Sequence, residues 1–200
     1  MWDSRYGEPG FAYGTEPNEF LAENAERYLP PKGEILSLAE GEGRNAVFLA
    51  SRGFRVTGVD SSAVGLAKAR ALAAERGVHI ETVVEDLARF DLGVDRWDGI
   101  VSIWCHNPPE VRTRLHRSVV AALRPGGVLL LESYTPKQLD YKTGGPRTPE
   151  LMMTAAGARE ELAGLELIVA EEKLREVHEG TYHDGTSAVL QVIARKPPRA

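Results

Sequence analysis

Short apolar stretches alternate with helical stretches along the chain from residue 34 to residue 134. Glycine, proline and aspartate bound the apolar stretches, whose short length predicts strands. The stretches between them have helical spacing and end at glycine or proline, so they predict helices. Strands that alternate with helices pair in parallel, with helices on both faces of the sheet. We therefore predict a doubly wound α/β fold with strands over 35–38, 55–59, 79–84, 97–104 and 128–134, and helices over 45–52, 63–76 and 109–123.

The two ends of the chain depart from this alternation. Near the start, apolar residues at helical spacing predict a helix over 18–28, which Pro30 and Pro31 end. Near the other end, residues 165–177 and 187–196 predict two long strands without a helix between them. Two adjacent strands joined by a loop most simply form an antiparallel pair. We expect this pair to close one edge of an otherwise parallel sheet.

The composition restricts the classes of function. The chain of 200 residues carries 24 Lys and Arg against 29 Asp and Glu, a net charge of −5 that argues against a nucleic-acid surface. Cys105 is the single cysteine, so no internal disulfide can form and a reducing compartment is favoured. No apolar run approaches the ~20 residues that span a membrane, and residues 1–10 lack a signal-peptide core. We expect a cytoplasmic protein without a membrane or nucleic-acid partner.

A glycine turn connects the first predicted strand to the helix that follows it. Residues 41–46 read Gly-Glu-Gly-Arg-Asn-Ala and match the G-x-G-x-x-A pattern of nucleotide-binding βαβ units. Asp60 lies 19 residues after Gly41, at the end of the second predicted strand, where an acid binds ribose hydroxyls. The combination predicts a ligand that contains adenosine. A close-packed strand–helix corner without a ligand is the alternative.

Carboxylates around this turn help to choose between adenosine ligands. Glu40 and Glu42 flank Gly41, and Glu85 and Asp86 follow the third predicted strand. A pyrophosphate is bound by backbone N–H groups at a helix N-terminus, and nearby carboxylates repel it. S-adenosylmethionine has no phosphate and carries an ammonium and a sulfonium, which an acidic crevice attracts. The charges favour S-adenosylmethionine, with Glu42 either in the site or solvated in the turn.

These motifs resemble those of class I S-adenosylmethionine-dependent methyltransferases over about residues 34–133. Residues 39–43 are similar to the family's first motif, Asp60 to its ribose-binding acid and Asp86 to its adenine-side acid. The resemblance implies a seven-stranded sheet in the order 3-2-1-4-5-7-6, with S-adenosyl-L-methionine as cofactor. We assign cofactor binding to Ala39, Glu40, Gly41, Gly43, Asp60, Ser61, Asp86, Leu87, Ile103, Trp104 and, from the N-terminal arm, Tyr13.

Two further segments, 13–18 and 35–50, narrow the resemblance. They are similar to the tellurite-resistance (TehB-like) and thiopurine methyltransferase branch, which favours a soft or small methyl acceptor. Ser37 departs from the family pattern because it stands where the family often has an acid, and Ala39 departs because it stands where the family has glycine. We expect Glu40 to compensate for the missing acid.

His106 is the candidate catalytic residue. It follows the fourth predicted strand, at the edge where open α/β sheets bind ligands. It could act as a base or contact the substrate, or it could be a loop-end residue that caps the next helix. Methyl transfer is mainly a matter of alignment, and a soft sulfur, selenium or tellurium acceptor needs little help from a base. We expect Cys105 to be a small buried residue rather than a nucleophile.

The histidines and acids between residues 178 and 184 fit no familiar zinc spacing, so we expect a polar hairpin loop there and no metal site. Residues 2–14 and 136–149 both combine aromatic residues with glycine. We expect these two segments to cover the cofactor edge as a lid that excludes water. Packing on the helical faces of the sheet is the alternative.

We therefore interpret residues 1–200 as one methyltransferase domain. It comprises an N-terminal arm and helix (1–30), a cofactor-binding core (34–134) and a substrate-side part (135–200) with a loop, a helix and an antiparallel strand pair. The expected activity is S-adenosylmethionine-dependent methyl transfer to a small molecule by a monomer or weak homodimer. The alternatives are a nicotinamide-dependent oxidoreductase with the same glycine turn and a non-catalytic module that senses the cofactor.

Overall fold

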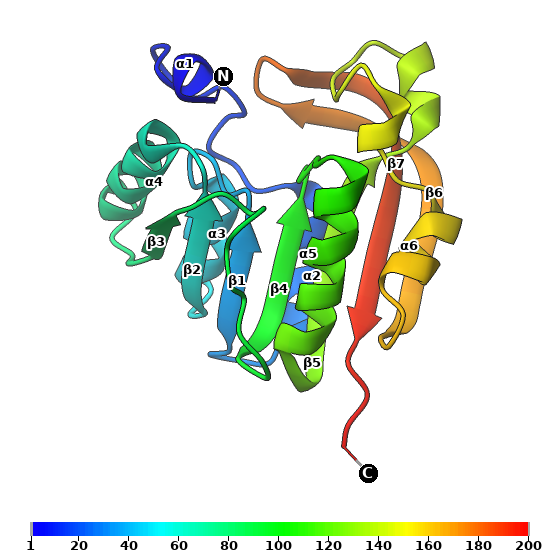
Figure 1. Cartoon of the computed structure of the whole chain (residues 1–200). Coiled ribbons are helices and arrows are strands. Elements are labelled where there is room, and N and C mark those ends of the chain that lie inside the picture. Colours follow the sequence, from blue (N-terminus) through cyan, green and yellow to red (C-terminus); the bar gives the residue numbers. More distant parts are fainter. Residues whose placement is uncertain (1, 200) are drawn as a thin grey trace.

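The strands form one sheet in the order β3-β2-β1-β4-β5-β7-β6 (Figure 1). The computed structural model describes residues 2–199. Strands β1 to β5 pair in parallel, whereas β7 pairs antiparallel with both β5 and β6. The order implied by the resemblance and the antiparallel edge are both confirmed. The strands are β1 (Glu34–Leu38), β2 (Arg55–Asp60), β3 (Glu81–Val84), β4 (Trp97–Ile103), β5 (Leu123–Tyr134), β6 (Glu166–Glu179) and β7 (His183–Arg195).

The helices begin and end close to the predicted residues. Asn18 caps α2 by accepting the N–H of Leu21 at 3.0 Å, and Ser62 caps α4 by accepting the N–H of Gly65 at 3.0 Å. No helix within residues 2–199 is long and apolar enough to cross a bilayer. The helices are α1 (Trp2–Tyr6), α2 (Glu19–Tyr28), α3 (Arg44–Ser51), α4 (Ala63–Glu75), α5 (Pro109–Ala122) and α6 (Ala155–Glu161), with short 3-10 turns at Pro136–Asp140 and Pro149–Leu151.

Two predicted boundaries are wrong. β5 begins at Leu123, before the Arg-Pro-Gly-Gly turn, because Leu123 still pairs with Trp97 of β4. β6 and β7 run on toward each other until only residues 180–182 separate them. The segment expected to be a polar loop is therefore the end of a long hairpin. The division of the chain into one domain stays a prediction.

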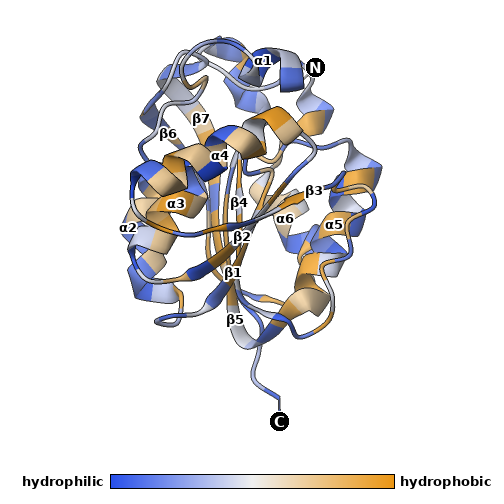
Figure 2. Cartoon of the chain, turned by 90° about the vertical axis from the view of Figure 1, so that its left-hand side faces the viewer, coloured by the Kyte–Doolittle hydropathy of each residue, from blue (hydrophilic) through white to orange (hydrophobic). Residues whose placement is uncertain are grey.

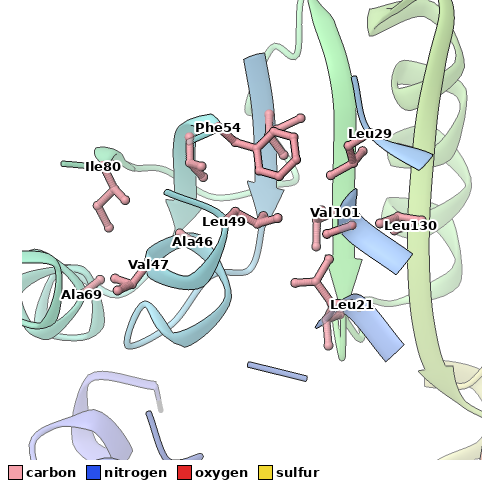
Figure 3. Close-up of a cluster of buried hydrophobic side chains, with 14 of the residues drawn as sticks. Leu21, Leu29, Ala46, Val47, Leu49, Phe54, Ala69, Ile80, Val101 and Leu130 are labelled. Atoms are coloured by element: carbon pink, nitrogen blue, oxygen red, sulfur yellow. The ribbon is translucent and has the colours of Figure 1, made fainter. Parts of the chain in front are cut away.

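Alternate side chains of each strand enter two apolar layers, one on each face of the sheet. On one face, Val101 and Leu130 pack with Leu21 of α2, Leu49 of α3 and Ala69 of α4 (Figure 3). On the other face, further strand residues pack against α5 and α6. Figure 2 shows the sheet between these two helical layers. Because helices cover both faces, the ends of the strands are left for a ligand.

The N-terminal arm, residues 2–14, meets the β6–β7 hairpin over the carboxyl ends of the parallel strands (Figure 1). The N–H of Thr181 in the hairpin turn donates to the carbonyl of Ala12 at 3.0 Å. Gly180 lies so close to the arm that a Cβ there would be 2.5 Å from Cα of Tyr13. The arm and the hairpin thus close against each other above one edge of the sheet.

Gly43 provides a test of how tightly the glycine turn is packed. Its φ is 97°, and a Cβ on it would lie 2.6 Å from Cα of Ala69, whereas Gly53, at φ 86°, has nothing within 4 Å of a Cβ. We expect Gly53→Ala to lower the free energy of unfolding by about 1 kcal/mol through its left-handed backbone alone. Gly43→Ala should lower it by about 2–4 kcal/mol, because overpacking adds to the backbone term. Denaturant titration measures both, and equal losses would contradict the close approach of α4.

Candidate active site

A cavity of about 570 Å³ lies at the carboxyl edge of the sheet. Small-molecule sites usually have volumes of ~300–1,000 Å³. In the order of the strands, its wall consists of the segments that follow β3, β2, β1 and β4, then the loop at 144–147 and the hairpin turn. The N-terminal arm completes the wall with Trp2, Arg5, Tyr6, Tyr13 and Gly14. Both segments expected to form a lid therefore contribute to the cavity.

The cavity brings together nearly all the residues that the sequence marks, from five separate segments. Gly43 is the exception, since it packs on Ala69 instead of facing the cavity. Arg44, Asn107 and His183 also line the cavity, although the sequence analysis did not assign them. The predicted residues that line it are Ala39, Glu40, Gly41, Asp60, Ser61, Asp86, Leu87, Ile103, Trp104, His106 and Tyr13.

Asp60 holds the glycine turn from the end of β2. One carboxylate oxygen accepts the N–H of Gly41 at 2.9 Å, and the other accepts the N–H of Ser62 at 2.8 Å. Burial raises the pKa of Asp60 above its ordinary value, and the backbone N–H groups act against that rise. The carboxylate therefore fixes the loop that the cofactor would contact and still faces the cavity.

Glu40 supplies the carboxyl group that Ser37 lacks. It accepts the hydroxyl of Ser37 and the N–H of Ala46 at 2.8 Å, which ties β1 to the start of α3. Its side chain lies against Gly58 of β2, where a Cβ would be 2.9 Å from Cγ of Glu40. The contacts agree with the expected compensation. Burial raises the pKa of Glu40 to about 7.

Glu42 is not a solvated turn residue. It is 5% exposed, accepts the N–H of Ala12 at 2.7 Å and pairs with Lys68 of α4 at 2.9 Å. Lys68 also donates to the carbonyls of Glu8 and Gly10 at 2.8 and 2.6 Å. Glu42 and Lys68 together fasten the N-terminal arm to the glycine turn.

Aromatic rings form the wall on the β4 side of the cavity. Trp104 stacks on Tyr134 with centroids 4.3 Å apart, and His183 lies at 5.2 Å, edge-on to Trp104. The backbone of Trp104 has a φ of 55°, which a bulky side chain adopts only when its surroundings hold it there. Its Nε1 donates to Glu179 at 2.6 Å, which fixes the plane of the indole.

His106 is neutral in this wall. Its Nε2 lies 3.4 Å from the backbone nitrogen of Tyr134. An N–H donates to the unprotonated ring nitrogen, so Nδ1 carries the single proton of the ring. The surrounding protein desolvates the imidazole and lowers the pKa of His106 to about 3. The backbone of Trp104 is the partner of the ring N–H, and His106 is a weak base.

The β6–β7 hairpin brings Glu179 to the back of the wall. Glu179 is 5% exposed and accepts from Arg44 Nη2 at 2.5 Å, from Trp104 Nε1 at 2.6 Å and from Asn18 Nδ2 at 2.8 Å. Burial alone would raise the pKa of Glu179, but its neighbours His183, Arg44 and Trp104 hold it well below the usual range. The expected hairpin is present and His178 and Asp184 on it are exposed, but Glu179 and His183 on its other face are buried against the sheet end.

Within residues 2–199, no group of three His, Cys, Asp or Glu side chains is arranged to hold a metal ion. Cys105 is not a reactive thiolate at neutral pH, because burial raises its pKa to about 12. Asn107 instead donates to its sulfur at 3.2 Å. The groups that remain for chemistry are the acids near β2 and β3, the arginines Arg5 and Arg44, and the neutral aromatic wall.

A comparison of the sequence with known families points to the same class of protein as the strand order of the sheet. Residues 35–127 match the model of a methyltransferase domain, and this segment contains the glycine turn, Asp60 and Asp86. Over these residues the resemblance drawn from the motifs is confirmed, and the strand order is the one that this resemblance implies.

Relatives of the methyltransferase domain are distant. The 2-heptyl-1-hydroxyquinolin-4(1H)-one methyltransferase of Mycobacteroides abscessus is 31% identical over 125 residues, 60% of this chain and 55% of that protein. The chain spans about half the length of the curated relatives that it matches. A structure solved in work on the conversion of a disulfide bond into a thioacetal group during echinomycin biosynthesis has a TM-score of 0.78 at 21% identity, covering 99% of this chain and 89% of that chain. TehB of Haemophilus influenzae has a TM-score of 0.71 at 17% identity, covering 98% and 65%. These structures share the fold.

The raised pKa of Glu40 makes a pH dependence of stability testable. The folded protein retains a proton up to pH 7, whereas the ordinary pKa is 4.5, so folding binds protons between these values. The Glu40 contribution should therefore lower stability as pH rises through this window. Glu40→Gln keeps an acceptor for the N–H of Ala46 and places an NH2 donor beside the hydroxyl oxygen of Ser37. It cannot ionise, so it should remove up to about 3 kcal/mol of the pH dependence.

The measurement is the free energy of unfolding at pH 5 and pH 8 for both proteins. Because His106 and the other titrating groups are present in both, the difference between the two slopes isolates Glu40. Parallel slopes for the wild type and Glu40→Gln would contradict a carboxyl group that titrates near neutral pH.

Proposed function

We propose that the protein transfers a methyl group from S-adenosylmethionine to a small-molecule acceptor. The observation that carries this proposal is Asp60, which ends β2, holds the glycine turn and lines a cavity of about 570 Å³. Each of its oxygens accepts one backbone N–H, whereas a carboxylate has about four lone-pair sites. The remaining lone pairs can accept from the two hydroxyls of a ribose.

The residues of the cavity suit the three parts of this cofactor. Asp60 would hold the ribose, Asp86 and Leu87 the adenine side, and residues 39–41 the methionine side. Glu42 is paired with Lys68, so Asp60 and Asp86 carry most of the unpaired negative charge toward the cavity. Two carboxylates attract a cation and repel a pyrophosphate, which favours S-adenosylmethionine over a nicotinamide dinucleotide. When bound, the cofactor supplies an electrophilic methyl group on its sulfonium.

The contribution of the chain is alignment and the exclusion of water. Arg5 donates to the hydroxyl of Tyr13 at 2.7 Å, and Tyr13 packs on His183 with ring centroids 4.7 Å apart. The guanidinium of Arg5 also lies 4.5 Å from the ring of Tyr182. These contacts fasten the arm to the hairpin over the cavity. The indole of Trp104 presents a ring face that attracts a cation.

The wall near β4 favours an acceptor that needs no strong base. His106 is neutral and lines the cavity, where it can contact an acceptor, but its low pKa makes proton abstraction inefficient. A soft sulfur, selenium or tellurium nucleophile attacks without that help. The stacked rings of Trp104, Tyr134 and His106 also suit a flat acceptor. The Mycobacteroides relative is named for a quinolinone acceptor.

The surroundings in which the enzyme works follow from the same features. The single cysteine, Cys105, suits a reducing compartment, so we place the enzyme in the cytoplasm. The net charge of −5 argues against a nucleic-acid partner. One chain supplies the whole wall of the cavity, which is compatible with a monomer or a weak homodimer.

Cofactor binding is the first test. We expect calorimetry to give S-adenosylmethionine and S-adenosylhomocysteine a Kd at least tenfold lower than that of NAD. Asp60→Ala should weaken the binding of S-adenosylhomocysteine by about 1.5–3 kcal/mol, the range for hydrogen bonds to a charged group. Asp60→Asn keeps an acceptor for one of the two backbone N–H groups. Comparing it with Asp60→Ala distinguishes the loss of ribose binding from the loss of support for the glycine turn. Tighter binding of NAD, or an unchanged Kd in a folded Asp60→Ala protein, would overturn the proposal.

Methyl transfer itself is tested with isotope-labelled S-adenosylmethionine and a panel of thiols, selenols, phenols and amines. With a soft acceptor, we expect His106 to contribute no pH dependence to kcat between pH 5 and 8, because its pKa lies below that range, whereas a titration of Glu40 near pH 7 would persist in His106→Gln. His106→Gln retains an N–H donor and should lower kcat less than about tenfold. A loss of ~1,000-fold, or a titration near pH 6–7 that His106→Gln abolishes, would identify His106 as a base. Cofactor binding without any labelled product would favour a sensing module.

A further inference from the structure

Arg44 is a buried arginine whose guanidinium is only partly paired. It is the first residue of α3, its side chain is 8% exposed, and it lines the cavity. Its Nη2 donates to Glu179 at 2.5 Å, whereas its Nη1 has no hydrogen-bond partner within residues 2–199. Buried N–H groups almost always find an acceptor, and an unpaired one is destabilising. The exception therefore points to an acceptor that a ligand brings.

The charge of Arg44 indicates what kind of acceptor fits. A guanidinium is charged at every physiological pH and prefers planar oxyanions, carboxylates above all. Glu179, its one partner, is itself shared with Trp104 and Asn18, so the positive charge is only partly compensated. The amino end of α3 adds partial positive charge at the same point. A carboxylate matches both the geometry and the charge.

The surroundings of Arg44 on the hairpin side are free of competing acids. Within the described residues, no carboxylate side chain that follows β4 in the sequence lines the cavity. Arg5 lines the same region, and its field acts with that of Arg44 on His183, whose pKa is lowered first by burial and then by these two arginines. The acids of the cavity lie at the end of β2 and in the segments that follow β1 and β3, and Arg44 itself belongs to the segment after β1, where its charge acts on Glu40. An anionic group would therefore be drawn to the side of Arg44 that faces the hairpin.

The side chain of Arg44 is also held ready for a ligand. Glu179 fixes Nη2, and Arg175 and Asn18 in turn fix Glu179 at 3.2 and 2.8 Å. The partner and its supports come from the hairpin and from Asn18, whose backbone N–H donates to Asn45 of α3 at 3.0 Å, so the same network also holds the start of α3. Little side-chain entropy is lost when such an arginine binds, which strengthens the bond to its ligand.

We propose that Arg44 is the carboxylate anchor of the cavity: Nη1 donates to the carboxylate of a bound ligand while Nη2 stays on Glu179. That carboxylate belongs either to the methionine part of the cofactor or to an acid group of the acceptor. The first source rests on the proposed function, because it requires the methionine-derived nucleoside to bind. The second source does not.

The first arm of the experiment compares two nucleosides that differ by one group. S-adenosylhomocysteine and S-adenosyl-3-thiopropylamine are alike except that the second lacks the carboxylate. We expect Arg44→Gln to raise the calorimetric Kd of S-adenosylhomocysteine about 10- to 100-fold. The Kd of the decarboxylated nucleoside should change by no more than about twofold. Arg44→Lys keeps the charge and should recover part of the loss. This result would assign the anchor to the cofactor.

The second arm uses labelled benzoate as an aromatic carboxylate. Equilibrium dialysis measures its binding to the free protein and to the protein saturated with S-adenosyl-3-thiopropylamine. Benzoate binding that falls at least fivefold in Arg44→Gln, with both nucleosides unaffected, would assign the anchor to the acceptor. If the ratio of the two nucleoside affinities is the same with and without Arg44, and benzoate binding does not depend on it, the proposal is overturned and Arg44 only ties α3 to Glu179.

Two controls keep the outcome interpretable. Arg124→Gln also removes an arginine that pairs with carboxylates, here Glu34 and Asp98, but at the opposite edge of the sheet. It should not change the affinity for either nucleoside. Thermal unfolding verifies that each variant folds, and if Arg44→Gln does not, Arg44→Lys carries the same comparison. Failure of the wild type to bind either nucleoside would overturn the proposed function, whereas the benzoate arm on the free protein would still test Arg44.

Discussion

Two buried carboxylates, Glu132 and Glu179, fix the positions of the elements around the cavity. Arg175 lies 2.8 Å from Glu132 and 3.2 Å from Glu179, and Asn18 donates to both at 2.6 and 2.8 Å. A buried carboxylate is tolerated only when its oxygens are paired, and removing one partner from such a set is strongly destabilising. Every segment that supplies a partner is therefore held in place. The residue before α2, β5 and the β6–β7 hairpin are joined in this way.

The strained backbone of Trp104 depends on this network. A tryptophan at φ 55° is unfavourable, and three interactions offset the strain: its backbone N–H donates to the carbonyl of Glu132 at 2.9 Å, its indole N–H donates to Glu179, and its ring stacks on Tyr134. Each of them involves β5 or the hairpin. The antiparallel end of the sheet therefore does more than close an edge, because it sets the direction of the aromatic ring that faces the cavity.

The sequence predicts the parts of the molecule that local pattern determines. The strands and helices alternate at short spacing, and the glycine turn and Asp60 lie within the single unit β1-α3-β2, so spacing is enough to find them. Arg44 and Glu179 are 135 residues apart, and only the antiparallel pairing of β6 and β7 brings them together. Gly43 matches the nucleotide motif but packs on Ala69, because a ligand contact and a close helix approach both require the absence of a side chain. A motif by itself does not distinguish the two.

The carboxyl group of Glu40, near the glycine turn, shows how packing changes the charge that an acidic residue carries. Ser37 is short, Glu40 is long and Gly58 has no side chain, and the three fit together because a Cβ at Gly58 would reach within 2.9 Å of Cγ of Glu40. The carboxyl group reaches the start of α3 from the loop instead of from β1. Its burial raises its pKa to about 7, so at neutral pH it brings only part of a negative charge. With Glu42 neutralised by Lys68, two of the acids that make this segment look strongly acidic contribute little field. The attraction for a cationic ligand then depends on Asp60 and Asp86, the acids that end or follow β2 and β3.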